Sequence, residues 1–404
     1  MITTKRDLKG GTPLWADSPR NSVRHRTVLD HEFCDVAIVG AGVTGALIAA
    51  NLTQLGLDVV VVDEREPARG GTLASTAMIQ FEIDTPLTVL SGKIGSKKAS
   101  RAYLSSLLAV HELKAFIARH KIRAEWKDRD ALYLAGDELG WRGLKEETEQ
   151  RQKIGLPSTF ISGPDLMSTY GFDRTGAIIS KGSAEVNPVQ LTAACLKIAQ
   201  GHGSRIYARQ EVMDVIASNG GVRLLTAPGG EISARRAIFA TGYEVVKGVP
   251  RDAFNIISTW AIATKPIRPA VFWPTRCLVW EASDPYLYMR STSDDRILIG
   301  GEDSKSNNPK RRDAAIPNKA KKLRAAAKKL LPDLEIEIDY AWGGTFADSR
   351  TGLPYITGID AFPNCLAVLG CGGNGITFGM VAATFAKRWV AGRSDPDADL
   401  FLGG

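Results

Sequence analysis

Long apolar runs, cysteine and histidine are all scarce in this 404-residue sequence. Its apolar stretches are about as long as β-strands, so we expect no membrane-spanning segment. Residues 1–30 are polar and rich in Arg and Lys, and they lack the apolar core of a signal peptide. We therefore expect these residues to form an irregular N-terminal arm.

The five cysteines and five histidines limit the possible chemistry further. The sequence has no C-x-x-C or H-x-x-x-H spacing, so a metal ion held by protein side chains is not expected. An odd number of cysteines, mostly in apolar or helical stretches, favours free thiols. These features predict a cytoplasmic protein without a metal site.

The positive charge is local. The net charge is +7, and basic residues gather in the arm and in residues 319–329, whose spacing is helical. No basic strand with interleaved aromatics is present, so we do not expect nucleic acid as a partner. The excess of positive charge favours an anionic substrate.

A dinucleotide-binding pattern is the most informative feature of the sequence. An apolar run at 36–39 ends in a G-x-G-x-x-G turn, followed by a helical stretch and a second apolar run at 59–62 that ends at Asp63. The three glycines permit a tight turn, the approach of a pyrophosphate, and close helix packing. The helix N-terminus attracts phosphates, and Asp63 is placed to accept ribose hydroxyls.

A second glycine-rich turn lies close to the C-terminal end. Residues 370–375 follow an apolar run at 366–369 and precede a helix. Two such turns so far apart in sequence suggest one extended ligand held at both ends. FAD has this shape.

The rest of the pattern indicates a mixed fold. Residues 96–120 are predicted to form an amphipathic helix with His111, Leu104 and Leu108 on its apolar face. Further expected elements are a strand at 131–134, helices at 138–153 and 187–200, hairpin turns at 219–221 and 228–230, a buried strand at 237–242, and strands within 257–301.

The chain resembles the D-amino-acid oxidase superfamily of flavoenzymes, which includes glycine and sarcosine oxidases. Four segments carry the resemblance, which covers about 33–392: the dinucleotide motif with 63–65, a G-x-T-x-x-S-T-like segment at 71–79, residues 240–244, and 342–356 followed by the glycine turn at 372–375. It implies an α/β plus α+β protein, with a Rossmann-like FAD-binding domain and a discontinuous antiparallel-sheet substrate domain. The FAD domain would comprise 31–85, 186–245 and 341–404, and the substrate domain 86–185 and 246–340.

The motifs and the resemblance together predict the residues that hold FAD. They are Gly40, Ala41, Gly42, Val43, Thr44, Gly45, Asp63, Glu64, Arg65, Gly71, Thr72, Ser75, Thr76, Ala77, Met78, Val212, Ala240, Thr241, Gly242, Gly344, Gly373, Asn374, Gly375, Ile376 and Thr377. The helix N-terminus at 375–377 is expected to stabilise negative charge on the flavin ring.

The resemblance also implies amine oxidation by hydride transfer to flavin N5. A carboxylate-bearing substrate would need a cation. The cations that related oxidases carry near Met78, Thr377 and Phe346 are absent. We therefore predict that the catalytic or anchoring residues include Tyr286, Tyr288, Arg290, Arg350 and Lys265. Strand alternation would place the two tyrosines and Arg290 on one face.

Several alternatives stay open from the sequence. Cys277 has the spacing of a covalent flavin attachment site, but its surroundings differ, so noncovalent FAD is favoured. The predicted function is oxidation of a small anionic amine, such as an N-substituted glycine, an imino-diacid or an amino acid, with molecular oxygen as acceptor. A dehydrogenase that reduces a quinone or carrier protein is the first alternative, and an enzyme acting on RNA or another macromolecule is the second.

Overall fold

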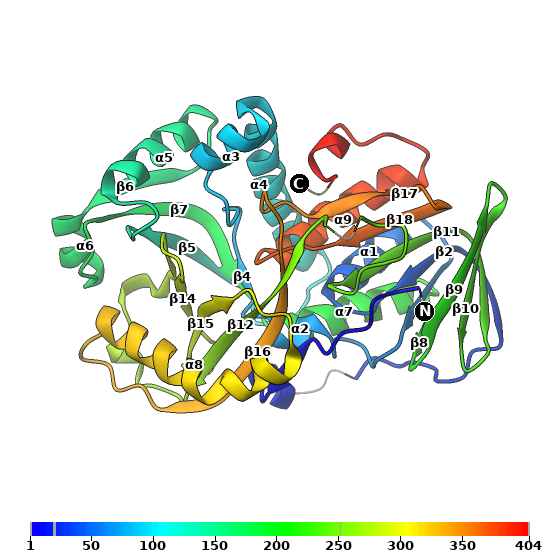
Figure 1. Cartoon of the computed structure of the whole chain (residues 1–404), viewed down its shortest axis with the longest axis horizontal. Coiled ribbons are helices and arrows are strands. Elements are labelled where there is room, and N and C mark those ends of the chain that lie inside the picture. Colours follow the sequence, from blue (N-terminus) through cyan, green and yellow to red (C-terminus); the bar gives the residue numbers. More distant parts are fainter. Residues whose placement is uncertain (1, 19–21, 251, 403–404) are drawn as a thin grey trace.

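The chain forms two β-sheets that are connected near the middle of the molecule (Figure 1). The structure is a computed structural model, and it describes residues 2–18, 22–250 and 252–402. One sheet and its helices lie beside the other, and the chain passes between them several times.

The first sheet is mostly parallel. Its order is β17 (Tyr355–Ile359), β18 (Phe362–Leu369), β11 (Glu231–Gly242), β2 (His31–Val39), β3 (Val59–Asp63) and β8 (Arg205–Ala208), with β10 (Gly221–Ala227) and β9 (Glu211–Ser218) forming an antiparallel extension from β11. The strands from β18 to β8 are parallel, and β17 is antiparallel. This is the predicted Rossmann-like arrangement, and both predicted hairpins are confirmed.

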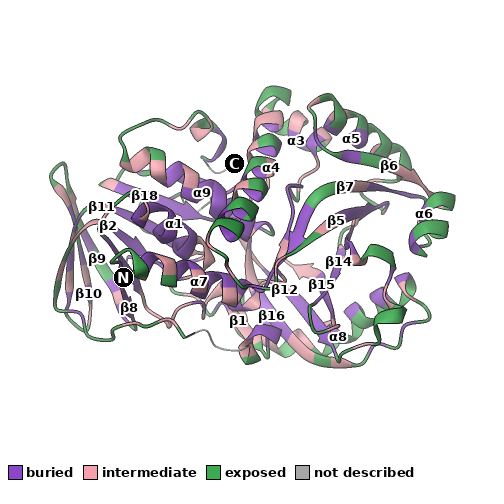
Figure 2. Ribbon diagram, turned by 180° about the vertical axis from the view of Figure 1, so that it is seen from behind, coloured by how far each residue is buried: buried purple, intermediate pink, exposed green. Residues whose placement is uncertain are grey.

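Both faces of the first sheet are covered, which explains its nearly unbroken apolar strands. On β2, Val36 and Ile38 pack in one buried cluster with the helices, whereas Ala37 and Val39 pack in a second cluster on the opposite face. The helical side holds α1 (Val43–Thr53), α7 (Pro188–Gly201), α9 (Gly375–Val390) and α4 (Ser96–Arg119). Figure 2 shows the buried strands and these partly buried helices.

The second sheet is almost entirely antiparallel, as predicted. Its order is β1 (Lys9–Gly11), β16 (Ile338–Asp348), β12 (Asn255–Thr264), β15 (Ile297–Ser304), β14 (Leu287–Ser291), β13 (Leu278–Glu281), β5 (Lys127–Leu134), β7 (Gly176–Glu185) and β4 (Met78–Ile79), with β6 (Ser158–Ser162) also paired to β7. Among the described strands of this second sheet, only the pairing of β13 with β5 is parallel.

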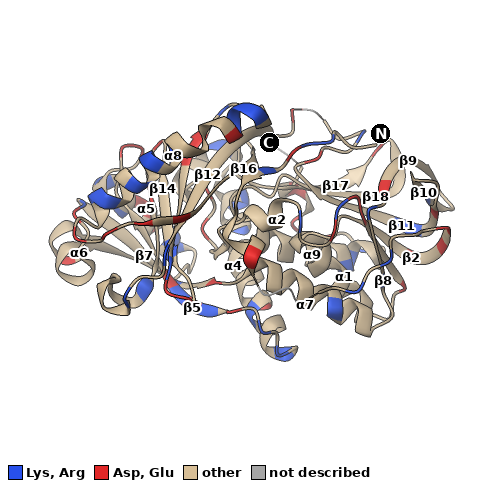
Figure 3. Ribbon diagram, turned by 90° about the horizontal axis from the view of Figure 1, so that it is seen from below, with Lys and Arg blue, Asp and Glu red and all other residues tan. Residues whose placement is uncertain are grey.

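Helices and short helical turns complete the second half. They are α2 (Gly71–Ala74), α3 (Leu87–Ile94), α5 (Trp141–Lys153), α6 (Gly163–Tyr170), α8 (Pro309–Leu330), η1 (Leu14–Asp17), η2 (Pro269–Val271), η3 (Pro274–Arg276) and η4 (Ala398–Leu400). The predicted basic helix is α8, whose apolar side packs on β12, β15 and β16. Most of its Lys and Arg residues lie along the outer edge of the molecule (Figure 3), whereas Arg312 is buried.

Two expectations about the chain's organisation are wrong. The N-terminal arm is not irregular, because it contains β1 and η1 and buries Leu8 and Trp15. Strand β16 pairs with β12, so residues 341–348 belong to the second sheet and not to the dinucleotide-binding half. The pairing partner of β16 is far away in sequence, and local patterns cannot identify it.

The face that α4 buries also differs from the prediction. Leu104 is 41% exposed and Leu108 is 56% exposed, and His111 is exposed as well. The buried face is built mainly from smaller residues and aromatics, including Ala102, Tyr103, Ala109, Leu113 and Phe116. Close packing against α9 and α3 favours small side chains at these contacts.

All five cysteines are free thiols, with Cys34 partly exposed and the others buried. Among the described residues, no helix combines the length and apolar character that a membrane crossing requires.

Candidate functional site

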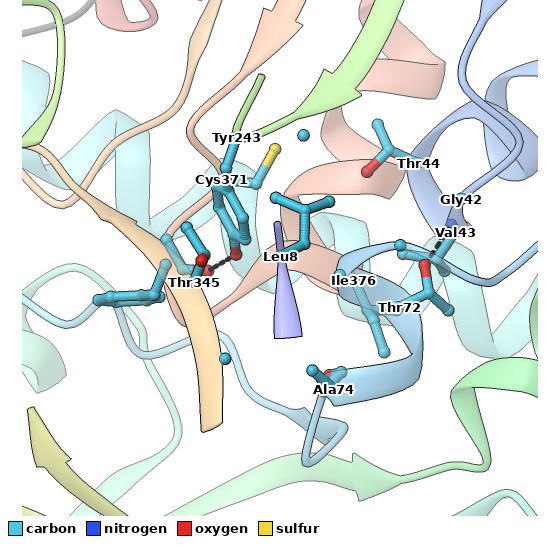
Figure 4. Close-up of a pocket in the computed structure, with 18 of the residues that line it drawn as sticks. Leu8, Gly42, Val43, Thr44, Thr72, Ala74, Tyr243, Thr345, Cys371 and Ile376 are labelled. Carbon is cyan, nitrogen blue, oxygen red and sulfur yellow. Dashed lines mark hydrogen bonds between the residues drawn. The ribbon is translucent and has the colours of Figure 1, made fainter. Parts of the chain in front are cut away.

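One elongated cavity runs between the two sheets and collects residues from many parts of the chain (Figure 4). Its walls come from the β2–α1 turn, the end of β3, residues 70–84, residues 210–212, residues 240–244, the ends of β12, β13 and β14, and the loop before α9. Side chains from the N-terminal segment, including Leu8, also line it.

The first end of the cavity is a glycine cradle. Gly40 has φ +115°, and a Cβ there would lie 2.3 Å from the carbonyl oxygen of Ala240. A Cβ at Gly45 would lie 1.9 Å from the carbonyl oxygen of Gly40. These positions therefore require glycine, and the glycines bring the β2–α1 turn close to β11.

The N-terminus of α1 faces this end of the cavity. The helix begins at Val43, and its N-cap Gly42 provides no side-chain cap. The Val43 N–H donates to Oγ1 of Thr72 at 2.9 Å, as Figure 4 shows. Gly42, Val43 and Thr44 all line the cavity. Helix N–H groups and the helix dipole make this a suitable site for phosphates.

Asp63 is fixed beside the cradle by two backbone groups. Its Oδ2 accepts from the Ala41 N–H at 2.6 Å, and its Oδ1 accepts from the Arg65 N–H at 2.7 Å. Burial raises the pKa of Asp63 to about 6, although both N–H groups act in the opposite direction. The Gln210 N–H donates to the Asp63 carbonyl at 2.9 Å, so Val212 and Asp63 lie at the same end of the cavity.

Glu64 and Arg65 form part of a charged network around this end. The Arg65 guanidinium donates to Glu244 at 2.8 and 3.2 Å and pairs with Glu64 at 2.5 Å. It also donates to the Arg6 carbonyl at 2.9 Å. Lys5 pairs with Glu64 at 3.5 Å. The N-terminal segment is thereby fastened across the dinucleotide end.

The second end of the cavity is formed by residues 71–84 and the start of α9. The Asn374 side-chain amide donates to the Glu82 carbonyl, and Thr377 Oγ1 donates to the Gln80 carbonyl at 2.9 Å. The Gly373 N–H donates to Asp84 Oδ2 at 3.1 Å. These bonds hold the N-terminus of α9 against the cavity, where Gly375 and Ile376 line it.

Most of the predicted cofactor-binding residues line the cavity. The members that do so are Gly40, Gly42, Val43, Thr44, Asp63, Glu64, Arg65, Gly71, Thr72, Ser75, Thr76, Met78, Val212, Ala240, Thr241, Gly242, Gly344, Gly373, Asn374, Gly375 and Ile376. Their contact with a cofactor stays a prediction, but the extended shape, the glycine cradle and the open helix N-terminus fit a dinucleotide.

The other four predicted cofactor residues lie behind the cavity wall. Ala41 donates to Asp63, and Gly45 packs against the Gly40 carbonyl. Ala77, with φ +54°, donates its N–H to Ser75 Oγ at 3.1 Å, and Thr377 is bonded to Gln80. They support neighbouring residues that do line the cavity.

The structure places Tyr286 and Tyr288 in the cavity but not Arg290. The two phenol rings lie 5.5 Å apart between centroids. Burial raises the pKa of both phenols, and Asp303 and Asp84 act in the same direction. Trp280 lines the same region and stacks on Tyr133 at 3.7 Å.

Arg290 is a correction to the predicted anion pocket. Its side chain is buried, and its Nε and two terminal nitrogens donate to the carbonyls of Thr76, Ser291 and Val186 at 2.6, 2.9 and 3.0 Å. Burial lowers the pKa of the guanidinium to about 10. Strand alternation predicted correctly that Arg290 shares a face with the two tyrosines. The strand continues past the cavity, however, so Arg290 lies beyond the cavity lining. It supports the loop that carries Thr76.

Lys265 and Arg350 are also outside the cavity lining. Lys265 is exposed and pairs with Glu337 at 2.7 Å. Thr259 on the same strand does line the cavity, but Lys265 is six residues further, about 20 Å at 3.3 Å per residue. Arg350 is exposed, and its carbonyl accepts from Lys93 at 2.6 Å.

Cys277 does not line the cavity either. It is 1% exposed in the core of the second sheet, where its carbonyl accepts from the Trp273 indole at 2.9 Å. Burial raises the pKa of the thiol to about 11. This placement gives no support to a covalent link and agrees with a noncovalent cofactor.

Sequence reasoning missed several lining residues. Gln80, Glu82 and Asp84 follow Met78 at alternate positions, whereas Ile79, Phe81 and Ile83 are fully buried in the core. This period of two was a usable signal. Tyr243 lies within the family segment 240–244 but was not singled out. Leu8, Thr259 and Trp280 carried no local signal, because distant segments bring them together.

Comparisons with known proteins agree with this geometry. A family model described as "DAO: FAD dependent oxidoreductase" matches residues 35–388. Over 372 residues the chain is 25% identical to a putative Rieske 2Fe-2S iron-sulfur protein of Bacillus subtilis, covering 91% of this chain and 70% of that protein. It is 23% identical over 382 residues to gamma-glutamylputrescine oxidoreductase of Escherichia coli, covering 91% of this chain and 85% of that protein.

Solved structures show the same fold. Glycine oxidase from Geobacillus kaustophilus superposes with a TM-score of 0.74 at 20% identity, covering 92% of this chain and 98% of that one. Iminodiacetate oxidase from Chelativorans has a TM-score of 0.68 at 18% identity, covering 89% and 96%.

Proposed function

Because the chain belongs to the family of FAD-dependent oxidoreductases, whose model spans residues 35–388, we propose that it oxidises the carbon–nitrogen bond of a small amine. It is an FAD-dependent enzyme of the amine and amino-acid oxidase type. The observation that carries the proposal is the single cavity that joins a dinucleotide cradle at Gly42 to an aromatic chamber at Tyr286 and Tyr288.

The residues of the cavity have separate tasks. The cradle and the α1 N-terminus would hold the pyrophosphate, Asp63 the ribose, and the α9 N-terminus the ring. Bound FAD supplies a hydride acceptor at flavin N5 for the carbon next to the substrate nitrogen. Tyr286, Tyr288 and Trp280 shield the reacting carbon from water, and the N–H groups at Gly375 and Ile376 stabilise nearby negative charge.

The finer part of the prediction was an anionic amine held through its carboxylate. The three cations predicted for this purpose, Arg290, Arg350 and Lys265, lie outside the cavity lining. The basic clusters that motivated an anionic substrate include those of α8, on the outer edge (Figure 3). We therefore retain the amine and do not assign any of these residues to a carboxylate.

Two electron acceptors stay within the proposal. Molecular oxygen is the predicted acceptor, and the names of the two oxidases with the same fold support it. A carrier protein is the alternative, and the relative named as a Rieske iron–sulfur protein supports that. A cytoplasmic location, predicted from the free thiols, belongs to the same proposal.

The test begins with the visible spectrum of the purified, FAD-reconstituted protein. We expect a flavin spectrum, release of the flavin on acid precipitation, and anaerobic bleaching by at least one member of a panel of amines and amino acids. Reoxidation by air with peroxide formation identifies an oxidase, whereas reoxidation only by an artificial dye identifies a dehydrogenase. A flavin that no amine or amino acid reduces would refute the proposal.

A further inference from the structure

The charges around the reaction end of the cavity have one sign. Among the described residues that line the cavity, Arg65 carries the only cationic side chain, and it is paired with Glu244 and Glu64 at the dinucleotide end. The reaction end instead contains Glu82 and Asp84. An amino-acid carboxylate placed there would meet like charge, which is unfavourable.

Asp84 is the carboxylate that a ligand can reach. Its side chain is exposed at the cavity, and it accepts from the Gly373 N–H at 3.1 Å. Burial raises the pKa of Tyr286, Tyr288 and Asp303, and the negative charge of Asp84 acts in the same direction. The field of Asp84 therefore extends through the aromatic chamber, where a substrate would lie.

Two further carboxylates stand behind it. Glu82 is 2% exposed, and neither of its oxygens has a hydrogen-bond partner. It forms an ion pair with the buried Arg151 at 3.6 Å, and Arg151 also pairs with Glu147 at 2.8 Å. Burial raises the pKa of Glu82, although Arg151 acts in the opposite direction. Asp303 has one buried oxygen without a hydrogen bond and interacts with the Tyr286 hydroxyl.

Lys319 acts on Asp303 and lowers the pKa of its carboxyl, but Lys319 also serves a second carboxylate. Lys319 pairs with Glu302 at 3.0 Å and also donates to the Glu302 carbonyl at 2.6 Å. Each of these two cations is thus shared between carboxylates, so carboxylates outnumber cations around the reaction end within the part of the chain that the structure describes.

Aromatic groups complete the chamber. The rings of Tyr286, Tyr288 and Trp280 line the cavity, and organic ammonium groups bind well against such rings. The indole N–H of Trp280 is buried and has no partner, although the residue, 8% exposed, borders the cavity. A buried donor without a partner is costly, and an ammonium group cannot accept from it. This N–H therefore indicates that the ligand in the chamber also presents an acceptor, such as the lone pair of a neutral amine nitrogen.

The anionic wall also limits which nitrogen it recognises. The carbon next to an amine nitrogen gives up hydride from its C–H bond only when that nitrogen is neutral, because the nitrogen lone pair must form the new C=N bond. Carboxylates favour the protonated ammonium form instead. The cation that this wall binds is therefore better suited to a second nitrogen that does not react.

From these observations we propose that the substrate is a diamine or polyamine that carries no carboxylate near its reacting carbon. The carbon next to one nitrogen is oxidised. The second nitrogen, as an ammonium group, lies between Asp84 and the rings of Tyr286 and Tyr288. This rests on the proposed amine oxidation and names its substrate class. The carboxylates act in binding and orientation.

A series with one carbon chain tests the inference in the flavin-loaded protein. Putrescine carries a second ammonium, butylamine a methyl group, and γ-aminobutyrate a carboxylate at the same position. We expect kcat/KM for anaerobic flavin bleaching to be about tenfold higher for putrescine than for butylamine and to be lowest for γ-aminobutyrate. Titrations monitored by the flavin absorbance shift should give the same order of dissociation constants.

Variants connect this order to the wall. Asp84→Asn removes the charge but keeps an oxygen that can accept from the Gly373 N–H, so the putrescine-to-butylamine ratio should fall by about tenfold. Asp128→Asn is the matched control, because Asp128 is exposed, pairs with Lys114 at 2.7 Å, and lies outside this cavity. Its ratio should equal that of the unmodified protein.

The outcomes separate the two proposals. Reduction of the flavin by glycine, sarcosine, iminodiacetate or γ-aminobutyrate in preference to putrescine would overturn the diamine inference and leave amine oxidation in place. A ratio unchanged by Asp84→Asn would overturn the role of the wall. If that variant does not fold, the substrate order in the unmodified protein decides. No reduction by any amine or amino acid would remove both proposals.

Discussion

Replacing Arg290 with methionine distinguishes two opposite expectations for one residue. From the sequence, Arg290 was to anchor a substrate carboxylate, so its loss should raise KM strongly. In the structure its guanidinium donates to three backbone carbonyls, those of Thr76, Ser291 and Val186. The variant should therefore lose stability and flavin, not substrate affinity.

The size of the effect follows from these contacts. Methionine fills similar space but leaves three buried carbonyls without this donor, at about 1–3 kcal/mol each. Relief of the cost of burying the guanidinium offsets part of this loss, so we expect about 3 kcal/mol of destabilisation. At about 2 °C per kcal/mol for a chain of this size, Tm should fall by about 6 °C.

Thermal unfolding followed by flavin fluorescence, with KM measured on the best amine, provides the assay. Lys265→Met is the matched control, because Lys265 is exposed and its ion pair with Glu337 is screened by solvent. We expect the control to keep the Tm of the unmodified protein. An Arg290→Met protein with unchanged Tm and flavin content, but a KM raised more than about tenfold, would refute the structural assignment.

Three further predictions follow from the cavity. Gly45→Ala should abolish FAD binding or folding, because its Cβ would lie 1.9 Å from a backbone oxygen, and a soluble, yellow Gly45→Ala protein would contradict this. The control Gly92→Ala in α3 places its Cβ where no atom lies within 4 Å, so it should be neutral or stabilising. Leu8→Ala should weaken FAD binding by about tenfold in a fluorescence titration, since burying such a side chain contributes about 1.5–3 kcal/mol, whereas Leu55→Ala, at an exposed position, should not weaken it. Equal FAD affinities of these two variants would show that the N-terminal segment does not hold the cofactor. Burial raises the pKa of Asp303 to about 6, so Asp303 gains its negative charge as the pH rises through about 6, and putrescine binding should tighten from pH 5 to pH 7. An Asp303→Asn variant should lose this pH dependence, and weaker putrescine binding at the higher pH would contradict the prediction.

Much of the fold was accessible from the sequence because its signals are local. The two apolar runs and the glycine spacing around β2, α1 and β3 predict a parallel βαβ unit, and Asn187-Pro188 marks the start of α7. The long-range pairing of β16 with β12, and of β1 with β16, was not accessible. Strand partners depend on which distant edges meet, and a sequence pattern within one strand does not carry that information.

The site divides in the same way. The glycines of the cradle are required by backbone geometry within a few residues, so their spacing is visible in the sequence. The reaction end is assembled from side chains at Asp84, Trp280, Tyr286 and other distant positions, and its charge is known only when they are together. Arg290 illustrates this difference. Strand alternation predicted its face correctly, but not that its position along the strand lies beyond the cavity.

By itself, the sequence determined that this protein holds a dinucleotide, because the tight turn, the open helix N-terminus and the acid at the end of β3 all arise within one continuous segment. Only the tertiary structure decided which charges face the substrate. Ionisable side chains act through distance and burial, and folding moved the predicted cations out of the cavity while bringing carboxylates to its reaction end.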